Sequence, residues 1–306
     1  MRRYIIRKLI SLPLILIGVS MLIFVSIRLL PGEPARVLAG PEATQEAVDA
    51  MTVRLGLDRS IPEQYATFVI NALQGDFGNS IRSSLPVWQE ISERLPNTVM
   101  LAIVAYVLAI IIGVPAGMIG AIWRNRAPDY LVMILAIAGA SMANFWLALM
   151  AMNYFAVQLN WVPLMGAGTW RHYILPAVTL AVLPMAVLAR MTRSSMIEVL
   201  SQDYIRTARA KGLDPRAVYW SHALRNAMIP IVTIVGLNFG GLIGGAVVTE
   251  TVFNWPGIGR LMVDAVRNRD YPVIQGVTMV AVCAVVFINF LAEMLIAALN
   301  PRIRFE

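Results

Sequence analysis

Six long runs of apolar residues constrain this chain more than any motif does. A run of about 20 apolar residues crosses the roughly 30 Å hydrocarbon core of a bilayer as one helix. The runs are Leu9–Ile27, Thr98–Ile122, Tyr130–Leu159, Ile174–Ala189, Ala227–Thr249 and Tyr271–Ala292. Charged residues make up only 14% of the chain, against about 25% in soluble domains. The sequence therefore predicts an all-α polytopic membrane protein with six transmembrane helices.

The distribution of Lys and Arg predicts how these helices are oriented. If the N-terminus is cytoplasmic, the inner segments hold 15 of the 25 basic residues, and six of the other 10 fall in or beside one long outer loop. Short inner loops rich in Lys and Arg are typical of cytoplasmic segments. The first apolar run is too long for a secretory signal and is read as a retained anchor. Both termini are therefore expected in the cytoplasm.

Four segments follow from this topology. Residues 1–30 form a cytoplasmic N-terminus and the first helix, 31–97 an outer region of short helices, 98–299 a core of five transmembrane helices, and 300–306 a cytoplasmic tail. In the outer region, Ser60 and Glu63 have the spacing of a capping box at the start of a helix. The core includes a long inner region, 193–226.

Several kinds of chemistry are excluded by the residues present. Cys283 is the only cysteine, and His172 and His222 fall on opposite sides of the membrane, so no metal site is expected. The net charge of +7 reflects the inner loops rather than a soluble basic face, so no nucleic-acid partner is expected. A phosphate-binding P-loop needs Gly-Lys-Ser/Thr, whereas Lys8 and Lys211 are followed by leucine and glycine. If ATP drives this protein, a separate subunit hydrolyses it.

The inner region contains a short basic helix with defined ends. Projected on one helical wheel, residues 196–211 place apolar and polar side chains on opposite sides. Gly212 is typical of the position after a helix C-terminus, and Asp214–Pro215 is typical of a new helix start. The apolar stripe is Ile197, Leu200, Tyr204 and Ala208; the polar side is Glu198, Gln202, Arg206 and Arg209. This elbow is either an ordinary positive loop or a docking surface for a cytosolic partner.

The elbow resembles a known cytoplasmic motif. The stretch "YIRTARAKGL" (204–213), followed by "HALRNAMIP" (222–230), is similar to the EAA loop of ABC-importer permeases, in particular the peptide/nickel/glutathione branch. Arg206, Thr207 and Ala208 occupy the Glu-Ala-Ala triplet and keep only its last alanine, while Gly212 occupies the glycine. Similar stretches extend over nearly the whole chain, among them "RLLPGEPA", "QGDFGNS", "FNWPGIGRL" and "ALNPRIRF", and they look most like glutathione or dipeptide permeases.

The resemblance implies a type I ABC importer permease in a bacterial inner membrane, a transport subunit rather than an enzyme. Its implied partners are a second homologous permease subunit, two ATPase subunits that bind ATP and Mg, a solute-binding protein and membrane lipid. The elbow would be the coupling helix that contacts an ATPase. The residues assigned to it are Asp203, Tyr204, Arg206, Thr207, Ala208, Arg209, Ala210, Lys211, Gly212 and Leu213. The implied cargo is a short peptide or glutathione, with nickel complexes and opine-like conjugates as alternatives.

Polar and small residues inside the apolar runs are the remaining candidates. Polar groups in a bilayer are costly, so they either bond neighbouring helices or line a path for a polar solute. These residues are Asn144, Asn153, Asn238 and Glu293. Glycines four residues apart let helices approach closely, and in this chain they are Gly236, Gly240 and Gly244, with Gly241 and Gly245. Phe253 and Trp255 suit the aromatic belt at the membrane surface or a plain structural loop.

Two other functions compete with the importer. A stand-alone secondary transporter usually shows two similar halves and charged coupling groups inside the membrane, and the sequence offers only Glu293. A membrane-embedded protease needs a nucleophile with a base in the membrane, whereas both histidines lie at its edges.

Overall fold

The structure is a computed structural model that describes residues 13–25, 35, 36, 43–54, 56 and 58–299. Within these ranges the regular elements are helices, apart from an isolated bridge between Asn79 and Pro86. The chain forms two compact units, each described by itself: unit 1 holds Met1–Pro96 and Arg260–Ala284, and unit 2 holds Asn97–Gly259 and Val285–Glu306. The all-α fold class predicted from the sequence is confirmed.

The helices follow one another along the chain, after an apolar helix at Pro13–Val25. They are α3 (Gln45–Arg54), α4 (Ile61–Leu73), α5 (Val87–Ile122), α6 (Ala127–Ser141), α7 (Asn144–Ala151), η1 (Met152–Gln158), α8 (Arg171–Leu200), α9 (Asp203–Ala210), α10 (Pro215–Ala217), η2 (Val218–Leu224), α11 (Arg225–Val252), α12 (Ile258–Asn268) and α13 (Tyr271–Leu299). The expected division between an outer region and a core at residue 97 stays a prediction, and α5 runs through that position.

Among the described residues, three helices are long and apolar enough to cross a membrane: Val87–Ile122, Arg171–Leu200 and Tyr271–Met294. Two bent pairs raise the number to five if each pair is one span. In one pair, Ala127–Ser141 and Asn144–Gln158 meet at 103°. The run Tyr130–Leu159, expected as one span, is therefore a broken helix. Met142 and Ala143 between the two parts adopt extended conformations. The first expected span, Leu9–Ile27, lies partly outside the described residues.

In unit 1, the predicted capping box at the start of α4 is confirmed. The Ser60 backbone N–H donates to Glu63 Oε2 at 3.2 Å, and Pro62 lies in the first turn. The aromatic ring of Tyr65 on α4 packs edge-on against Phe24 of the Pro13–Val25 helix, with 5.3 Å between ring centroids. Such pairs add about 0.5–1.5 kcal/mol beyond their buried area. Helix α4 is therefore held against the Pro13–Val25 helix.

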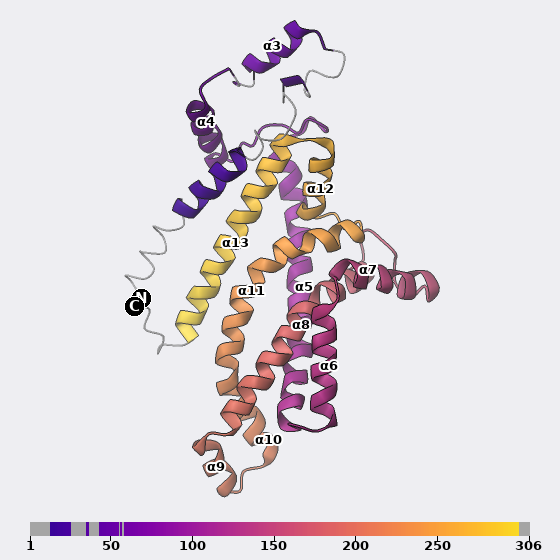
Figure 1. The fold of residues 1–306 in the computed structure, drawn as a ribbon, viewed down its shortest axis with the longest axis vertical. Coiled ribbons are helices and arrows are strands. Elements are labelled where there is room, and N and C mark those ends of the chain that lie inside the picture. The colour runs from indigo at the N-terminus through magenta and orange to yellow at the C-terminus, as the bar shows by residue number, and fades with distance from the viewer. Residues whose placement is uncertain (1–12, 26–34, 37–42, 55, 57, 300–306) are drawn as a thin grey trace. The chain divides into compact units, whose positions relative to one another are not determined.

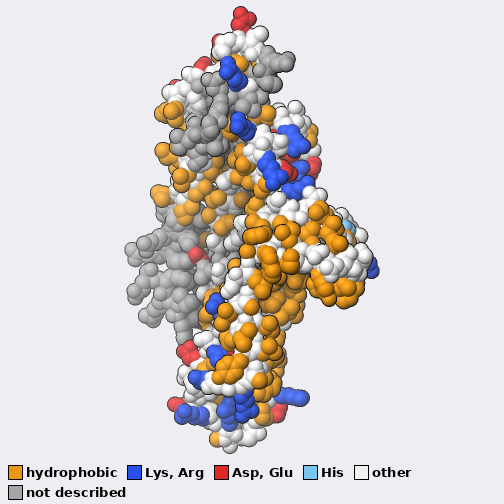
Figure 2. Space-filling view, turned by 45° about the vertical axis from the view of Figure 1, so that its right-hand side comes forward, with side chains coloured by type: hydrophobic (Ala, Val, Ile, Leu, Met, Phe, Trp, Pro, Cys, Tyr) orange, Lys and Arg blue, Asp and Glu red, His pale blue; other side chains and the backbone are white. Residues whose placement is uncertain are grey.

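In unit 2, α6, α8 and α11 run side by side, α7 projects to the side, and α9 and α10 form one end (Figure 1). Its largest core cluster joins α5, α8 and α11 and includes Leu101, Tyr106, Leu180, Leu188 and Ile231. Hydrophobic side chains cover much of the helices, and Lys and Arg side chains gather at the end that carries α9 (Figure 2). This distribution is that of a membrane helix bundle with one polar end.

Glycines on α5 bring that helix into close contact with α8. A Cβ atom on Gly117 would collide with the backbone of Ala189, and one on Gly113 would lie 2.8 Å from the Met185 carbonyl oxygen. The sequence pattern predicted close packing at the α11 glycines instead. Among those, Gly240 faces Asn289 of α13, whose Oδ1 lies 2.8 Å from the position of an added Cβ atom.

The other α11 glycines differ from Gly240. Gly241 and Gly244 have open space where a side chain would be. Gly236 and Gly245 also lie in α11, and their packing role stays a prediction.

Candidate functional site

The elbow of the inner region is built from α9 and the residues that end it. α8 ends at Leu200, Gln202 is extended, and α9 begins at Asp203. After α9, the Gly212 N–H donates to the Arg209 carbonyl oxygen at 2.9 Å. Gly212 has φ of +78°, a left-handed conformation that side chains disfavour. The helix, glycine stop and Asp-Pro restart are arranged as the sequence predicts.

The buried side of α9 differs from the predicted stripe. Ile205 is fully buried and Ala208 is 8% exposed, and both pack in a cluster with Met196 of α8. Tyr204, assigned to the apolar stripe, is 44% exposed and accepts a hydrogen bond from Asn226 at 3.0 Å. The predicted stripe is right for Ile197, Leu200 and Ala208, which pack in this cluster, and wrong for Tyr204, because the break after α8 shifts the helical register.

The side of α9 that faces away from the helix bundle is polar and exposed to solvent. Arg206 lies 3.3 Å from Asp203, with both side chains largely in solvent, so this ion pair contributes little stability. The Thr207 hydroxyl donates to the Asp203 carbonyl oxygen at 3.0 Å. Other exposed residues of the elbow are Arg209, Ala210, Lys211 and Gly212, while Leu213 is half-buried. The elbow therefore has an apolar side held by the bundle and a basic side available to a partner.

An ion pair that the sequence did not reveal lies between α6 and α8. Arg193 Nε lies 2.5 Å from Asp129 Oδ1, and Arg193 Nη2 lies 2.7 Å from Oδ2. The Asn125 backbone N–H donates to the same carboxylate at 2.9 Å. The Asp129 side chain is 2% exposed and that of Arg193 is 26% exposed. This two-point contact, which is the stronger form of an Arg–carboxylate pair, fixes the start of α6 to α8 about two turns before α8 ends at Leu200.

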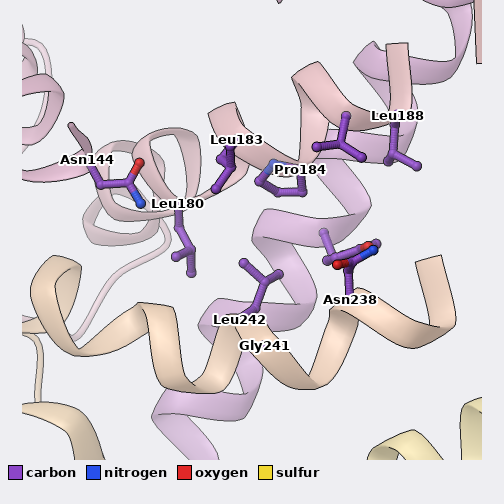
Figure 3. Close-up of a pocket in the computed structure, with 10 residues that line it drawn as sticks. Asn144, Leu180, Leu183, Pro184, Leu188, Asn238, Gly241 and Leu242 are labelled. Atoms are coloured by element: carbon purple, nitrogen blue, oxygen red, sulfur yellow. The ribbon is translucent and has the colours of Figure 1, made fainter. Parts of the chain in front are cut away.

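A cavity of about 290 Å³ lies among α5, α7, α8 and α11. Leu180 of α8 and Leu242 of α11 point towards one another across it, and Asn144 and Asn238 lie at opposite ends (Figure 3). Pro184 on α8 also lines the cavity and lacks the N–H that would bond to the Leu180 carbonyl. Among the described residues, the lining includes no Asp, Glu, Lys, Arg or His.

Three polar side chains of the described chain line this cavity. Asn238 donates through Nδ2 to the Ile234 carbonyl oxygen at 3.0 Å, which leaves its Oδ1 as an acceptor. Asn144 makes no side-chain hydrogen bond to the described residues. Tyr106 is 3% exposed and packs edge-on against Phe239, and its hydroxyl likewise has no partner in the part of the chain that the structure describes. Tyr106 was missed in the sequence, where a tyrosine inside an apolar run reads as packing.

Only two of the four polar residues predicted for a solute path line this cavity. Asn144 and Asn238 line the same cavity. Asn153 lies in η1 with an exposed side chain, and Glu293 lies in α13 and is half-buried, and neither belongs to the cavity lining.

A second polar network lies in unit 2, at the end of α11 that follows the cavity. Glu250 is fully buried, and its Oε1 accepts a hydrogen bond from the Thr98 hydroxyl at 2.6 Å. The same hydroxyl accepts a hydrogen bond from the Ile258 N–H at 2.9 Å. A Cβ atom on Gly259 would lie 2.9 Å from Glu250 Oε2, so this glycine leaves room for the carboxyl group. Three chain segments therefore meet at one buried carboxyl group.

The loop after α11 is part of this network rather than a membrane-surface belt. Trp255 is fully buried and Phe253 is 2% exposed, which contradicts their assignment to the aromatic belt. Trp255 donates through Nε1 to the Asn97 carbonyl oxygen at 3.3 Å, and Asn97 donates through Nδ2 to the Pro256 carbonyl oxygen at 2.9 Å. Tyr173 packs edge-on against Trp255 at 4.5 Å. Both aromatic side chains are core residues because the loop folds back onto α5 and α8.

A bundle of apolar helices with a cavity between them and a basic helical elbow at one end is typical of a membrane transport subunit. Comparison with known families agrees. Residues 113–305 match the family described as "Binding-protein-dependent transport system inner membrane component", and residues 1–102 match its N-terminal component. The chain belongs to this family.

Similar sequences support this family, and similar solved structures support the fold. The chain is 48% identical, over its whole length and theirs, to the "Glutathione transport system permease protein GsiC" of Escherichia coli (strain K12) and of Shigella dysenteriae serotype 1 (strain Sd197). The fold matches the inward-facing MetNI methionine ABC transporter with a TM-score of 0.60 at 18% identity, covering 69% of this chain and 96% of that one. A second match, an amino acid ABC transporter with histidines, has a TM-score of 0.55 at 12% identity and covers 69% and 94%.

The protein is therefore a multi-pass inner-membrane permease subunit of an ATP-binding-cassette importer. It is not itself an enzyme, because ATP hydrolysis in such systems belongs to separate subunits. Its partners include an ATPase and a solute-binding protein. The alternative of a stand-alone secondary transporter is not favoured.

Proposed function

We propose that this chain forms half of the membrane path of an importer for glutathione or short peptides. The observation that carries this proposal is the 48% identity, over 306 residues of both chains, to relatives named as glutathione transport permeases. A second, similar permease chain forms the other half, and two ATPase subunits bind ATP and Mg. A solute-binding protein delivers the cargo on the outer side. Both chain termini are then cytoplasmic, as the Lys and Arg distribution indicates.

The coupling role of α9 is supported by its two sides. Ile205 and Ala208 fix the helix to the bundle, while Arg206, Arg209 and Lys211 are exposed. A partner groove with acidic or polar groups would complement this basic side. The coupling residues predicted from the sequence, from Asp203 to Leu213, are proposed to make the ATPase contact.

The cavity is proposed to be part of the solute path. It lies between helices that apolar composition assigns to the membrane, and it contains uncharged polar groups suited to a polar solute. Asn144 and Asn238 are its proposed path residues, while a path role for Asn153 and Glu293 stays a prediction. α8 lines the cavity with Leu180 and leads directly towards α9.

Uptake in cells that carry the complete transporter tests this proposal. Cells that produce both permease chains, the ATPases and the binding protein are given radiolabelled glutathione or Gly-Leu. The double variant Arg206→Glu, Arg209→Glu is expected to lose uptake and to co-purify with less ATPase, because repulsion replaces attraction at the contact. Arg126→Glu, an exposed charge reversal outside the elbow, serves as the matched control and retains both. Wild-type cells that import neither solute would refute the cargo, and an unaffected double variant would refute the contact.

A further inference from the structure

We infer that the cavity among α5, α7, α8 and α11 binds an uncharged amide segment of the solute, held by Tyr106, Asn144 and Asn238. This inference rests on the proposed function, since it identifies which part of a peptide-like cargo occupies the path. The charged ends of the same cargo lie outside this cavity while the amide segment is bound. The cavity is thus a neutral hydrogen-bonding site in the middle of a membrane protein.

The available donors and acceptors match an amide group. A peptide group offers one N–H donor and one C=O acceptor. Asn144 supplies an NH₂ donor and a carbonyl acceptor that no described residue uses. Asn238 Oδ1 is a further acceptor because its Nδ2 already bonds to Ile234. The Tyr106 hydroxyl, on a side chain that is 3% exposed, is both donor and acceptor. A bound amide therefore finds partners for both of its groups.

The same lining disfavours ions. A charged group moved into this cavity gives up its hydration, and no described side chain of opposite charge lines the cavity to compensate. Carboxamides and a phenol are dipoles, so they satisfy hydrogen bonds without selecting a sign of charge. The leucine side chains on both walls instead suit an aliphatic side chain next to the amide. The ligand class is consequently an uncharged peptide unit with an apolar neighbour.

The size of the cavity sets how much of the cargo fits. Its volume of about 290 Å³ lies at the lower limit of the roughly 300–1,000 Å³ that is typical of small-molecule sites. The cavity therefore holds part of a peptide rather than an entire extended one. This agrees with a site that the cargo passes through one unit at a time.

A lipid chain is the competing occupant, and a neighbouring groove with exposed apolar side chains offers an acyl chain more space. That groove, of about 940 Å³, lies along α5 and the start of α8. Its wall includes Met100, Ile103, Val107 and Ile111, each at least 42% exposed. An acyl chain in the smaller cavity would leave the buried Tyr106 hydroxyl and the half-buried Asn144 carboxamide without partners, which is unfavourable for polar groups removed from water. The groove contains one carboxamide, Asn97, which already donates to the Pro256 carbonyl oxygen, so the groove provides the control.

The first experiment measures occupancy directly. The complete transporter, with Cys283→Ala to remove the native thiol, is placed in lipid nanodiscs and carries Leu183→Cys in the cavity or Ile111→Cys in the groove. The rate of N-ethylmaleimide labelling is measured with and without the uncharged peptide N-acetyl-alanyl-leucine amide. We expect the peptide to slow labelling of Leu183→Cys by about threefold or more and to leave Ile111→Cys unchanged.

The inference would be overturned by an absence of protection at Leu183→Cys, by equal protection at both positions, or by equal protection by free lysine. Protection that follows the lipid composition of the nanodisc rather than the peptide would assign the cavity to an acyl chain.

The second experiment changes the charge of the cavity. Asn238→Asp is compared with Asn238→Leu, and Val107→Ala in the groove is the control. The readout is peptide moved per ATP hydrolysed, with binding protein that has been loaded beforehand with Ala-Leu-Ala or Ala-Lys-Ala. Asn238→Asp is expected to raise the ratio of transported Ala-Lys-Ala to transported Ala-Leu-Ala by about threefold or more. Asn238→Leu is expected to lower transport of both peptides. A merely structural role would lower both peptides equally in both variants.

The outcome also separates this inference from the proposed function. If the wild-type transporter moves neither peptide nor glutathione, the proposed cargo is wrong. If the wild type transports peptides while the ratio is unchanged in Asn238→Asp and Leu183→Cys is unprotected, the cargo stands and the cavity assignment is wrong.

Discussion

Replacing Thr98 by valine removes a buried hydroxyl that joins α5 to the end of α11 and the loop that follows. The hydroxyl donates to Glu250 Oε1 at 2.6 Å and accepts from the Ile258 N–H at 2.9 Å. Thr98 and Glu250 are both fully buried, so water cannot replace the lost partner. Valine has nearly the same shape, so the change isolates the two hydrogen bonds from packing.

The expected cost follows from these two bonds. A buried carboxyl oxygen left without its donor and a buried N–H left without an acceptor each cost about 1–3 kcal/mol. The Thr98→Val variant is therefore expected to lose about 3–5 kcal/mol of unfolding free energy. Thr98→Ser keeps the hydroxyl and removes one methyl group, which costs about 1 kcal/mol.

Thermal unfolding of the purified protein in nanodiscs, followed by tryptophan fluorescence, measures this difference. At roughly 2–4 °C per kcal/mol for chains of 150–250 residues, the valine variant should unfold at least about 6 °C below the wild type and clearly below the serine variant. If valine and serine variants unfold within about 2 °C of each other, the hydroxyl does not hold these segments together and the reasoning is refuted.

Three further predictions concern the bundle and the elbow. Gly117→Val places a side chain against the α8 backbone and is expected to reduce the yield of monodisperse protein in size-exclusion chromatography, whereas Gly244→Ala, in open space, is not. Asp129→Ala leaves a partly buried arginine without its partner and should cost about 3 kcal/mol in thermal unfolding, whereas Asp203→Asn in the exposed pair should stay within about 0.5 kcal/mol. Gly212→Val forces a β-branched residue to φ of +78° and should abolish transport and ATPase stimulation while membrane insertion, measured by fractionation, persists.

Features encoded by neighbouring residues were predictable from the sequence. The apolar runs predict the membrane helices because the thickness of the bilayer sets the minimum length of a helix that crosses it. The ends of α9 follow from a glycine and an Asp-Pro pair within a few residues. The helix break at Met142 and Ala143 was not predictable, because neither residue is Gly or Pro and both ordinarily continue a helix. The extended residues there follow from the packing of α6 and α7 against other helices rather than from local preference.

The polar contacts missed in the sequence have partners far along the chain. Glu250 lies 152 residues from Thr98, and Asp129 lies 64 residues from Arg193. Glu250, Asp129 and Arg193 each read alone as a charge near the end of an apolar run, and only the fold shows that they are paired. The cavity is missed for the same reason, since its polar groups come from α5, α7 and α11.

The position of α8 relates the elbow to the cavity. From Pro184 at the cavity to Leu200 at its end, α8 rises about 24 Å at 1.5 Å per residue. Along this length the α5 glycines pack against its backbone, and Arg193 binds Asp129 of α6. Close backbone packing and a buried ion pair resist sliding, so we expect α5, α6 and α8 to move together when α9 is displaced. Variants that loosen either contact should therefore lower the amount of solute moved per ATP before they abolish ATP hydrolysis.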